Sequence, residues 1–324
     1  MDVSVIINTY NNEKWIERCL QSVINQSYVD IECIVVDDCS TDNTFDICNR
    51  IKRQYPRLQL FNNNCNMGCS LTRKEGYAHS TGDYVVFIDG DDWLEKDFVL
   101  KMVSQAKKNN ADLVYCDYYE EDGVESKIMV QNINNKTNSQ IIAAMVSYDP
   151  YLVSSLWNKL IRRDLLSNIV FPPERYGEDM YISLQLAYYS KSYLYIPKAL
   201  YHYWVNNSDS ISNDKNKETE RRLAMYDICT KNLLFLKCHF QSNIQFEPWL
   251  SIRINKTAIR IFEYSELRKI RDVTTLYPPA IKYIFRKEIK INILTRLRYI
   301  MFFLNKHLIA LMNKHFNGKK IITS

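Results

Sequence analysis

Strand-like and helix-like segments alternate between residues 3 and 88 of this 324-residue chain. Four short runs rich in apolar residues and bounded by turn formers are typical of buried strands: 3–7, 31–36, 58–61 and 84–88. The segments between them carry apolar residues at helical spacing: 15–24, 41–55 and 70–80. This β-α-β-α order predicts an α/β fold of the Rossmann-like kind, with a mostly parallel sheet and helices on both faces. Ligands of such sheets bind outside the carboxyl ends of the strands.

Three carboxylates follow the fourth of these strands, in the sequence FIDGDDW. Asp89, Asp91 and Asp92 lie within four positions, with Gly90 between the first two. Carboxylates this close repel one another, so holding them together costs free energy unless a cation or hydrogen-bond donors neutralise them. Oxygen ligands suit Mg²⁺ or Mn²⁺, which leave positions open for water and phosphate. The alternative is an acidic turn in front of a helix that starts near Trp93.

Two further polar loops, 8–12 and 37–40, are expected at the same edge, because they follow the first and second strands. Asp38 could accept a hydrogen bond from a base N–H or a ribose hydroxyl, and Tyr10 could stack on the base. A cap for the helix that follows explains Asp38 equally well. The chain has neither a G-x-G-x-x-G after the first strand nor a G-x-x-x-x-G-K-[ST], which argues against dinucleotide-binding dehydrogenases and P-loop NTPases.

The third expected helix opens on Asn66-Met67-Gly68 and carries Arg73 within its first two turns. A glycine-led helix start offers backbone N–H groups to a phosphate, and an arginine just inside it offers a fork of guanidinium donors. We therefore expect this segment to hold a diphosphate close to the carboxylates. The alternative for Arg73 is an ordinary surface arginine.

Four motifs resemble, in order and spacing, the N-terminal half of family 2 glycosyltransferases of the GT-A fold: VSVIINTYNNEKWIERCLQSVINQSY, IVVDDCSTDNT, NMGCSLTRKEG and GDYVVFIDGDDW. The resemblance is strong over about residues 1–120. It implies a nucleotide-sugar donor, usually uridine-linked, and a Mn²⁺ or Mg²⁺ ion at Asp89 and Asp91. The donor-binding residues that it implies are Thr9, Tyr10, Asn11, Asp38, Gly68, Arg73, Asp89, Gly90 and Asp91. Asn8 departs from the proline that is frequent in the family, and at that position mainly a backbone contact is expected.

The segments 155–160, 171–189 and 194–211 resemble the weaker C-terminal pattern of the same family. Attack by an acceptor hydroxyl needs a base within hydrogen-bond reach, and a carboxylate at a helix start can be held stiffly for that task. The residues alone leave a second explanation, because acids in the first turn also favour the helix dipole. The resemblance favours catalysis, with Asp179 as the base and Glu178 beside it. Contacts to the acceptor or the diphosphate are expected from Asp92, Trp157, Lys159, His202 and Ser210.

The sequence pattern changes to helical spacing after about residue 212. This change predicts a catalytic domain over 1–212 and a basic helical region over 213–324. Within the catalytic domain we expect a nucleotide-binding half at 1–92 and an acceptor half at 93–212. Residues 281–320 carry ten Lys and Arg and a single acid. A basic amphipathic helix of this kind can lie on an anionic membrane surface. The alternative is that the basic region packs against the catalytic domain or against a second copy of the chain. Packing against a second copy would make a homodimer.

The chain is expected in the cytoplasm. Contact of the basic region with a membrane would place it at the inner face of the cell membrane. No signal peptide or uninterrupted apolar run of about 18 residues is evident. Nine cysteines without a C-x-x-C pair favour a reducing compartment.

The activity that the resemblance implies is inverting transfer of a hexosyl or hexosaminyl group to a growing glycan or a lipid-linked acceptor in bacterial capsule or other surface polysaccharide synthesis. No nucleic-acid partner is expected. One alternative is a sugar nucleotidyltransferase, but the loop NTYNNEKW lacks the glycine and arginine that such an enzyme wants there. The other is a carbohydrate-binding protein without activity on the same fold. The first interpretation requires the acids to lie beside the ends of the first two strands and to keep negative charge that fixed cations do not neutralise.

Overall fold

The computed structural model describes residues 1–131, 133, 137–147, 154–206, 217–239 and 297. The chain divides into two compact units, Met1–Lys215 and Asn216–Ser324. In the second unit the structure describes helix α7 (Glu218–His239) and Leu297. Ser210 and, apart from Leu297, the basic stretch 281–320 lie outside the described residues. No helix in the described part of the chain combines the length and the apolar character that crossing a membrane requires.

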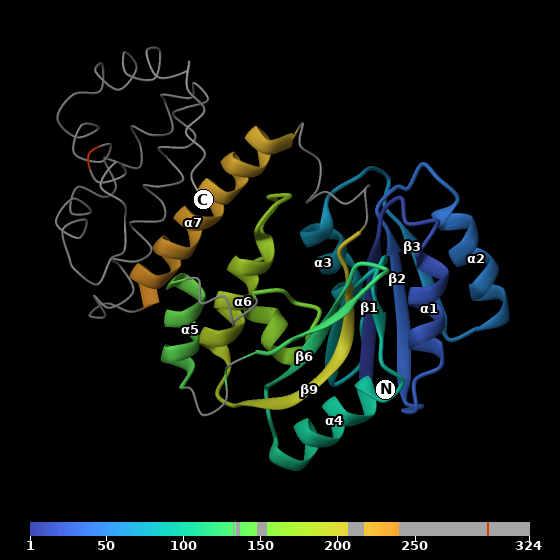
Figure 1. The fold of residues 1–324 in the computed structure, drawn as a ribbon, viewed down its shortest axis with the longest axis horizontal. Coiled ribbons are helices and arrows are strands. Elements are labelled where there is room, and N and C mark those ends of the chain that lie inside the picture. The colour runs from blue at the N-terminus through green and yellow to red at the C-terminus, as the bar shows by residue number, and fades with distance from the viewer. Residues whose placement is uncertain (132, 134–136, 148–153, 207–216, 240–296, 298–324) are drawn as a thin grey trace. The chain divides into compact units, whose positions relative to one another are not determined.

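The first half of unit 1 is a parallel sheet with the strand order β3-β2-β1-β4 (Figure 1). Its strands are β1 (Val3–Thr9), β2 (Ile31–Asp37), β3 (Leu58–Asn62) and β4 (Tyr84–Asp89). The connections carry α1 (Ile16–Ile24), α2 (Thr44–Gln54) and α3 (Cys69–His79). The register pairs Asn8 with both Val36 and Asp89. The carboxyl ends of the three central strands therefore lie at one edge, as the sequence predicts.

Alternating side chains of β1 explain why helices cover both faces of this sheet. Val5 and Ile7 belong to a core cluster with Leu20 of α1. Ile6 points to the opposite face, towards α3, where a Cβ added at Gly76 would lie 2.3 Å from Ile6 Cγ2. All seven residues of β1 are buried, which is the pattern of a strand covered on both sides.

The second half of unit 1 continues the sheet as β4-β8-β6-β9-β5, with β7 paired to β6. Strands β6 and β9 are parallel, whereas β8 runs antiparallel to β4 and β6. The elements in chain order are β5 (Trp93–Leu94), α4 (Phe98–Asn109), β6 (Leu113–Glu121), β7 (Ser126–Met129), α5 (Asn138–Ser147), β8 (Lys159–Arg162), the 3-10 helix Arg163–Asn168, α6 (Glu178–Tyr189) and β9 (Tyr193–Trp204).

Two features of this half differ from what the sequence suggests. The helix after the acidic turn starts at Phe98 and not near Trp93, because Trp93 and Leu94 pair with His202 and Tyr201 of β9. A strand that the sequence does not predict, β7, pairs with the end of β6. The predicted α/β fold is confirmed, with antiparallel strands added beyond β4.

Candidate active site

The loops after β1, β2 and β4 are joined by backbone hydrogen bonds. The Asp38 N–H donates to the Thr9 carbonyl at 2.8 Å, and the Gly90 N–H donates to the Asn8 carbonyl at 3.0 Å. A Cβ at Gly90 would lie 2.5 Å from Thr9 Oγ1, so only glycine fits this close approach. The three loops thus form one surface, and the acidic turn 89–92 lies in it.

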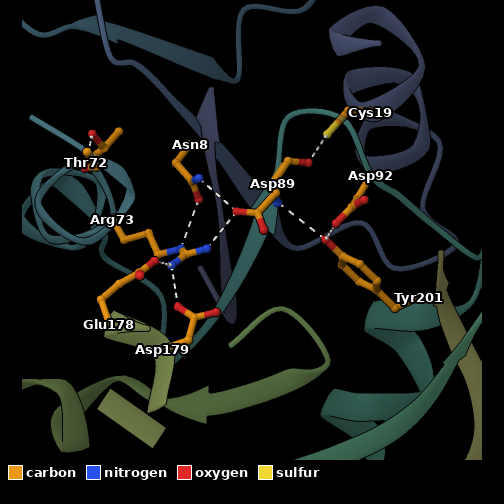
Figure 2. Close-up of polar contacts among 10 residues, drawn as sticks. Asn8, Cys19, Thr72, Arg73, Asp89, Asp92, Glu178, Asp179 and Tyr201 are labelled. Carbon is orange, nitrogen blue, oxygen red and sulfur yellow. Dashed lines mark hydrogen bonds and ion pairs between the residues drawn. The ribbon is translucent and has the colours of Figure 1, made fainter. Parts of the chain in front are cut away.

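Arg73 is the centre of the polar network at this edge (Figure 2). Its Nη2 donates to Asp89 Oδ1 at 2.7 Å, and its Nη1 donates to Asp179 Oδ1 at 2.6 Å and Glu178 Oε1 at 3.2 Å. The Arg73 Nε donates to Asn8 Oδ1 at 3.2 Å, and Asn8 Nδ2 donates to Asp89 Oδ1 at 2.8 Å. One guanidinium therefore brings together Asp89, at the end of β4, and the carboxyl pair at the start of α6.

This arrangement corrects the role expected of Arg73. The residue is only 2% exposed, so it is not a surface arginine. Its Nε, Nη1 and Nη2 all point at protein acceptors, so in this structure it holds carboxylates instead of presenting its donors to a diphosphate. Asn8 also does more than the backbone contact expected of it, because its amide joins Arg73 to Asp89.

The cluster holds more carboxyl groups than cations. Burial and the neighbouring Asp179 raise the pKa of Glu178 to about 8, so that this carboxyl is protonated at neutral pH. Burial also raises the pKa of Asp179, against the lowering effect of Arg73. Burial lowers the pKa of Arg73, but the charges of Asp179 and Asp89 outweigh burial and raise this pKa well above its ordinary value. Three carboxyl groups thus share one guanidinium.

The glycosyltransferase interpretation requires that no fixed cation neutralises the carboxylates of the acidic turn. This requirement is met only in part, because Arg73 pairs with Asp89. Both bonds to Asp89 end on Oδ1, and the side chain is 24% exposed. Asp91 is partly exposed in the same turn. In the described part of the chain, no three His, Cys, Asp or Glu side chains form a ready metal cluster. Mg²⁺ and Mn²⁺ sites often use one or two carboxylates together with substrate phosphates, so Asp89 and Asp91 fit such an ion.

Asp38 ties the β2 loop to the start of α3. Its carboxylate accepts from Asn63 Nδ2 at 2.8 Å and from the backbone N–H groups of Met67 and Gly68 at 2.8 and 2.7 Å. It therefore does not cap the helix that follows it, which was the alternative explanation. Because a carboxylate offers about four acceptor positions, these three bonds leave room for one ligand donor.

The β1 loop presents Tyr10 to solvent at 38% exposed, whereas its other candidates are engaged with protein. Asn11 adopts φ 53°, its Oδ1 accepts from the Thr41 N–H at 2.8 Å, and its N–H donates to Ser40 Oγ at 2.9 Å. Thr9 is 3% exposed. Tyr10 is thus the residue of this loop that is best placed to meet a base.

Asp92 and His202, expected to contact the acceptor or the diphosphate, are held by protein partners instead. Asp92 is 0% exposed and accepts from the Tyr201 hydroxyl at 2.5 Å and the Trp204 N–H at 2.8 Å. The His202 ring nitrogens lie 2.7 Å from Glu121 Oε1 and 3.0 Å from Glu95 Oε1. The physical reason is that both residues fasten β9 to the segment that follows the acidic turn.

Lys159 and Trp157 also serve the interior. Lys159 is 0% exposed and donates to Asn158 Oδ1 at 2.9 Å and to the Ser155 carbonyl. Burial lowers the pKa of Lys159 to about 7, and the charge of Asp179 opposes that shift. Trp157 is 6% exposed and stacks on Tyr201 with 4.5 Å between ring centroids. In this structure neither side chain is presented to a substrate.

A glycosyl transferase family 2 model matches residues 4–170, and the chain belongs to this family. It is therefore a glycosyltransferase. The chain is 30% identical over 234 residues to the putative glycosyltransferase EpsH of Bacillus subtilis. The matched segments cover 69% of this chain and 67% of EpsH.

Two further proteins are similar over more of the chain. The minor teichoic acid biosynthesis protein GgaB of B. subtilis is 28% identical over 292 residues, covering 84% of this chain but only 32% of GgaB. The crystal structure of S. aureus TarS 1-349 in complex with UDP-GlcNAc superposes with a TM-score of 0.64 at 20% identity, over 88% of this chain and 80% of the TarS 1-349 chain. This likeness shows the GT-A fold.

Proposed function

We propose that the chain is an inverting glycosyltransferase that moves a sugar from a uridine diphosphate sugar to a hydroxyl of a growing glycan or a lipid-linked acceptor in surface polysaccharide synthesis. The observation that carries the proposal is the shared guanidinium of Arg73, which holds Asp89 and Asp179 in one cluster. Two similarities support the choice of substrates. TarS is described in complex with UDP-GlcNAc, and GgaB is described as a teichoic acid biosynthesis protein.

Asp179 is the proposed base. Its Oδ1 is fixed by Arg73, and 22% of the side chain is exposed. Burial raises the pKa of Asp179, which makes it a better proton acceptor. As the acceptor oxygen bonds to the anomeric carbon, Asp179 takes the hydroxyl proton, and the bond from that carbon to the diphosphate oxygen breaks. A single displacement in line inverts the anomeric centre.

Asp89 and Asp91 would hold Mg²⁺ or Mn²⁺ in this reaction. Bound there, the ion would supply positive charge against the negative charge that develops on the leaving diphosphate. The contribution of Arg73 is positional, because it fixes Asp89 and Asp179 relative to each other. Because Glu178 is neutral, it places no second negative charge beside Asp179. The guanidinium of Arg73 is then shared by Asp89 and Asp179.

Incubation with Mn²⁺ and a panel of nucleotide sugars, with and without glycan acceptors, tests the reaction. We expect release of a nucleoside diphosphate from a uridine-linked donor. Release of pyrophosphate in a mixture of nucleoside triphosphate and sugar phosphate would instead support a nucleotidyltransferase, and binding without turnover would support a carbohydrate-binding protein. Family membership favours the transferase over both.

Replacement of Asp179 by Asn tests the base. The amide keeps the size of the side chain but cannot take a proton, so we expect transfer to fall by about 10²–10⁴-fold while UDP binding is retained. Transfer rates and calorimetric UDP binding measure the two effects separately. Asp46→Asn, at an exposed position in α2, is the matched control. Unchanged transfer in Asp179→Asn contradicts the assignment.

A further inference from the structure

Three tryptophan rings surround the guanidinium of Arg18, whose side chain also contacts the acidic turn. The Arg18 Cζ lies 3.6 Å from the ring centroid of Trp93, 5.1 Å from Trp15 and 5.2 Å from Trp204. These residues come from α1, the residue just before it, β5 and the end of β9. The faces of indole rings attract a cation, most strongly where water is excluded. The rings thus hold the guanidinium in place.

The caged guanidinium donates a hydrogen bond to the acidic turn. Arg18 Nη2 donates to the backbone carbonyl of Asp91 at 2.7 Å. The Arg18 Nε is buried and has no hydrogen-bond partner among the described residues. Burial lowers the pKa of Arg18, although the charges of Asp92 and Asp91 favour its ionised form.

The carboxylates on either side of Asp91 in the turn are held by side-chain and backbone contacts. Asp89 is held by Arg73 and Asn8, and Asp92 is held by Tyr201 and the Trp204 N–H. Between these fixed points, the bond from Arg18 pins the peptide that carries Asp91.

A sugar-stacking platform is the other use that three tryptophans next to an active site suggest. Their contacts argue against it. The Trp93 ring lies against both Arg18 and His202, the latter with 4.8 Å between centroids and 10° between planes. Trp204 packs on Trp15 at 4.9 Å, and a Cβ added at Gly123 would lie 3.0 Å from its Cη2. The rings face protein groups, which fits a structural cage for Arg18.

We propose that Arg18 is a positioning residue that orients the Asp91 carboxylate towards the metal ion and the donor diphosphate by fixing the Asp91 peptide. This inference rests on the proposed function. It predicts that loss of Arg18 acts on metal-dependent nucleotide binding, since outer contacts of a ligand set its orientation and their loss typically weakens metal binding by about 10–100-fold.

The experiment compares Arg18→Met, which keeps much of the length but removes charge and donors, with Arg18→Lys, which keeps a cation and a donor in the cage. Arg50→Met is the matched control, because Arg50 pairs with Glu17 on the surface, where both side chains are about half exposed. Calorimetric titrations measure UDP binding at increasing Mn²⁺ concentration and again in EDTA. Thermal unfolding shows whether each variant is folded.

We expect Arg18→Met to raise the Mn²⁺ concentration for half-maximal UDP binding by about tenfold or more, with Arg18→Lys intermediate and Arg50→Met like the unchanged chain. UDP binding in EDTA should change little in all three. Equal Mn²⁺ dependence in all variants overturns the inference, and so does an equal loss of UDP binding with Mn²⁺ and in EDTA. If Arg18→Met does not fold, Arg18→Lys decides.

The unchanged chain separates failure of this inference from failure of the proposed function. If it neither binds UDP with Mn²⁺ nor releases nucleotide from any sugar donor, the proposed function is contradicted. If it does both while the Arg18 variants match it, only the role of Arg18 is contradicted.

Discussion

Arg73 shows how one buried side chain decides the stability of the site as well as its geometry. Its side chain is 3% exposed and faces Asp89, Glu178 and Asp179. Arg73→Met leaves these carboxyl groups without their shared cation, and removal of one member of a buried pair typically costs about 3–5 kcal/mol. We expect a loss of that size in the free energy of unfolding, measured in urea.

Arg50→Met is the control for this measurement, because the Arg50–Glu17 pair is exposed and such pairs contribute about 0–1 kcal/mol. A loss in Arg73→Met no larger than in the control would show that the carboxylates relax into water or take up protons at little cost. The central role given to Arg73 would then be wrong.

Glu178 gives the site a pH signature. Its pKa lies near 8 in the folded protein, mainly through burial, against 4.5 ordinarily. Between these values the folded state binds more protons than the unfolded state, so this residue makes stability fall as pH rises. Below about pH 4.5 its contribution is fully present, and it is lost as pH rises through about 8.

Glu178→Gln removes this titration but keeps the size of the side chain. We expect its melting temperature to fall less steeply between pH 5 and pH 8 than that of the unchanged chain, in about the window that the shift defines. Glu75→Gln, at a partly exposed site on α3, is the comparison. Parallel curves for Glu178→Gln and the unchanged chain would contradict the raised pKa.

The residues that gather at the site were predictable from the sequence, but their partners were not. Asp38, Asp89 and Asp179 could be placed because strand ends and a helix start fix where the backbone brings them. The direction of the Arg73 guanidinium depends on how the start of α6 packs near the end of β4, and no local pattern carries that information. Arg18 was missed for the same reason, because its cage comes from segments far apart in sequence.

At the scale of elements, the close packing of α3 on β1 depends on Gly76. A Cβ there would lie 2.3 Å from Ile6 Cγ2 and 3.4 Å from Val36 Cγ2. Gly76→Ala therefore forces the helix away from the sheet, although alanine favours helix formation. We expect a loss of about 1–3 kcal/mol in the free energy of unfolding. Because α3 carries Arg73, transfer should also slow.

The neighbouring Glu75→Ala controls for a change of side chain on the same helix, since Glu75 is partly exposed and such changes usually stay within about 0.5 kcal/mol. A Gly76→Ala variant as stable as Glu75→Ala would mean that helix propensity offsets the clash. The close approach of α3 would then not be required for the fold.

The long elements followed from sequence periodicity, whereas β5 and β7 did not. Strand β5 has two residues, too few for any alternation to be seen, and it exists because β9 offers Trp93 and Leu94 a pairing partner. Strand β7 has mostly exposed residues, so burial leaves no apolar pattern in it. Its pairing with β6 follows a turn in which Gly123 adopts φ 88°.

At the scale of the whole molecule, the charge of residues 281–320 is separate from the chemistry of unit 1. This stretch holds ten Lys and Arg and one acid, and it lies outside the described residues apart from Leu297. We propose that it binds anionic membrane surfaces. Each basic residue near such a surface contributes about 1 kcal/mol, so loss of four should weaken binding by roughly a thousandfold. The variant replaces by Gln the residues Lys282, Arg286, Lys287 and Lys290.

Sedimentation with vesicles of phosphatidylglycerol or phosphatidylcholine measures this binding. We expect the unchanged chain to bind only the anionic vesicles and to be released at high salt, because salt screens charges that face water. The matched control removes the same charge from exposed positions of unit 1 by Gln at Lys52, Arg53, Lys108 and Lys191. If both variants lose vesicle binding equally, the total charge of the chain drives this binding, and residues 281–320 have no specific role in it. If neither loses binding, an apolar or protein contact explains the stretch, and the second copy of the chain becomes the partner to test.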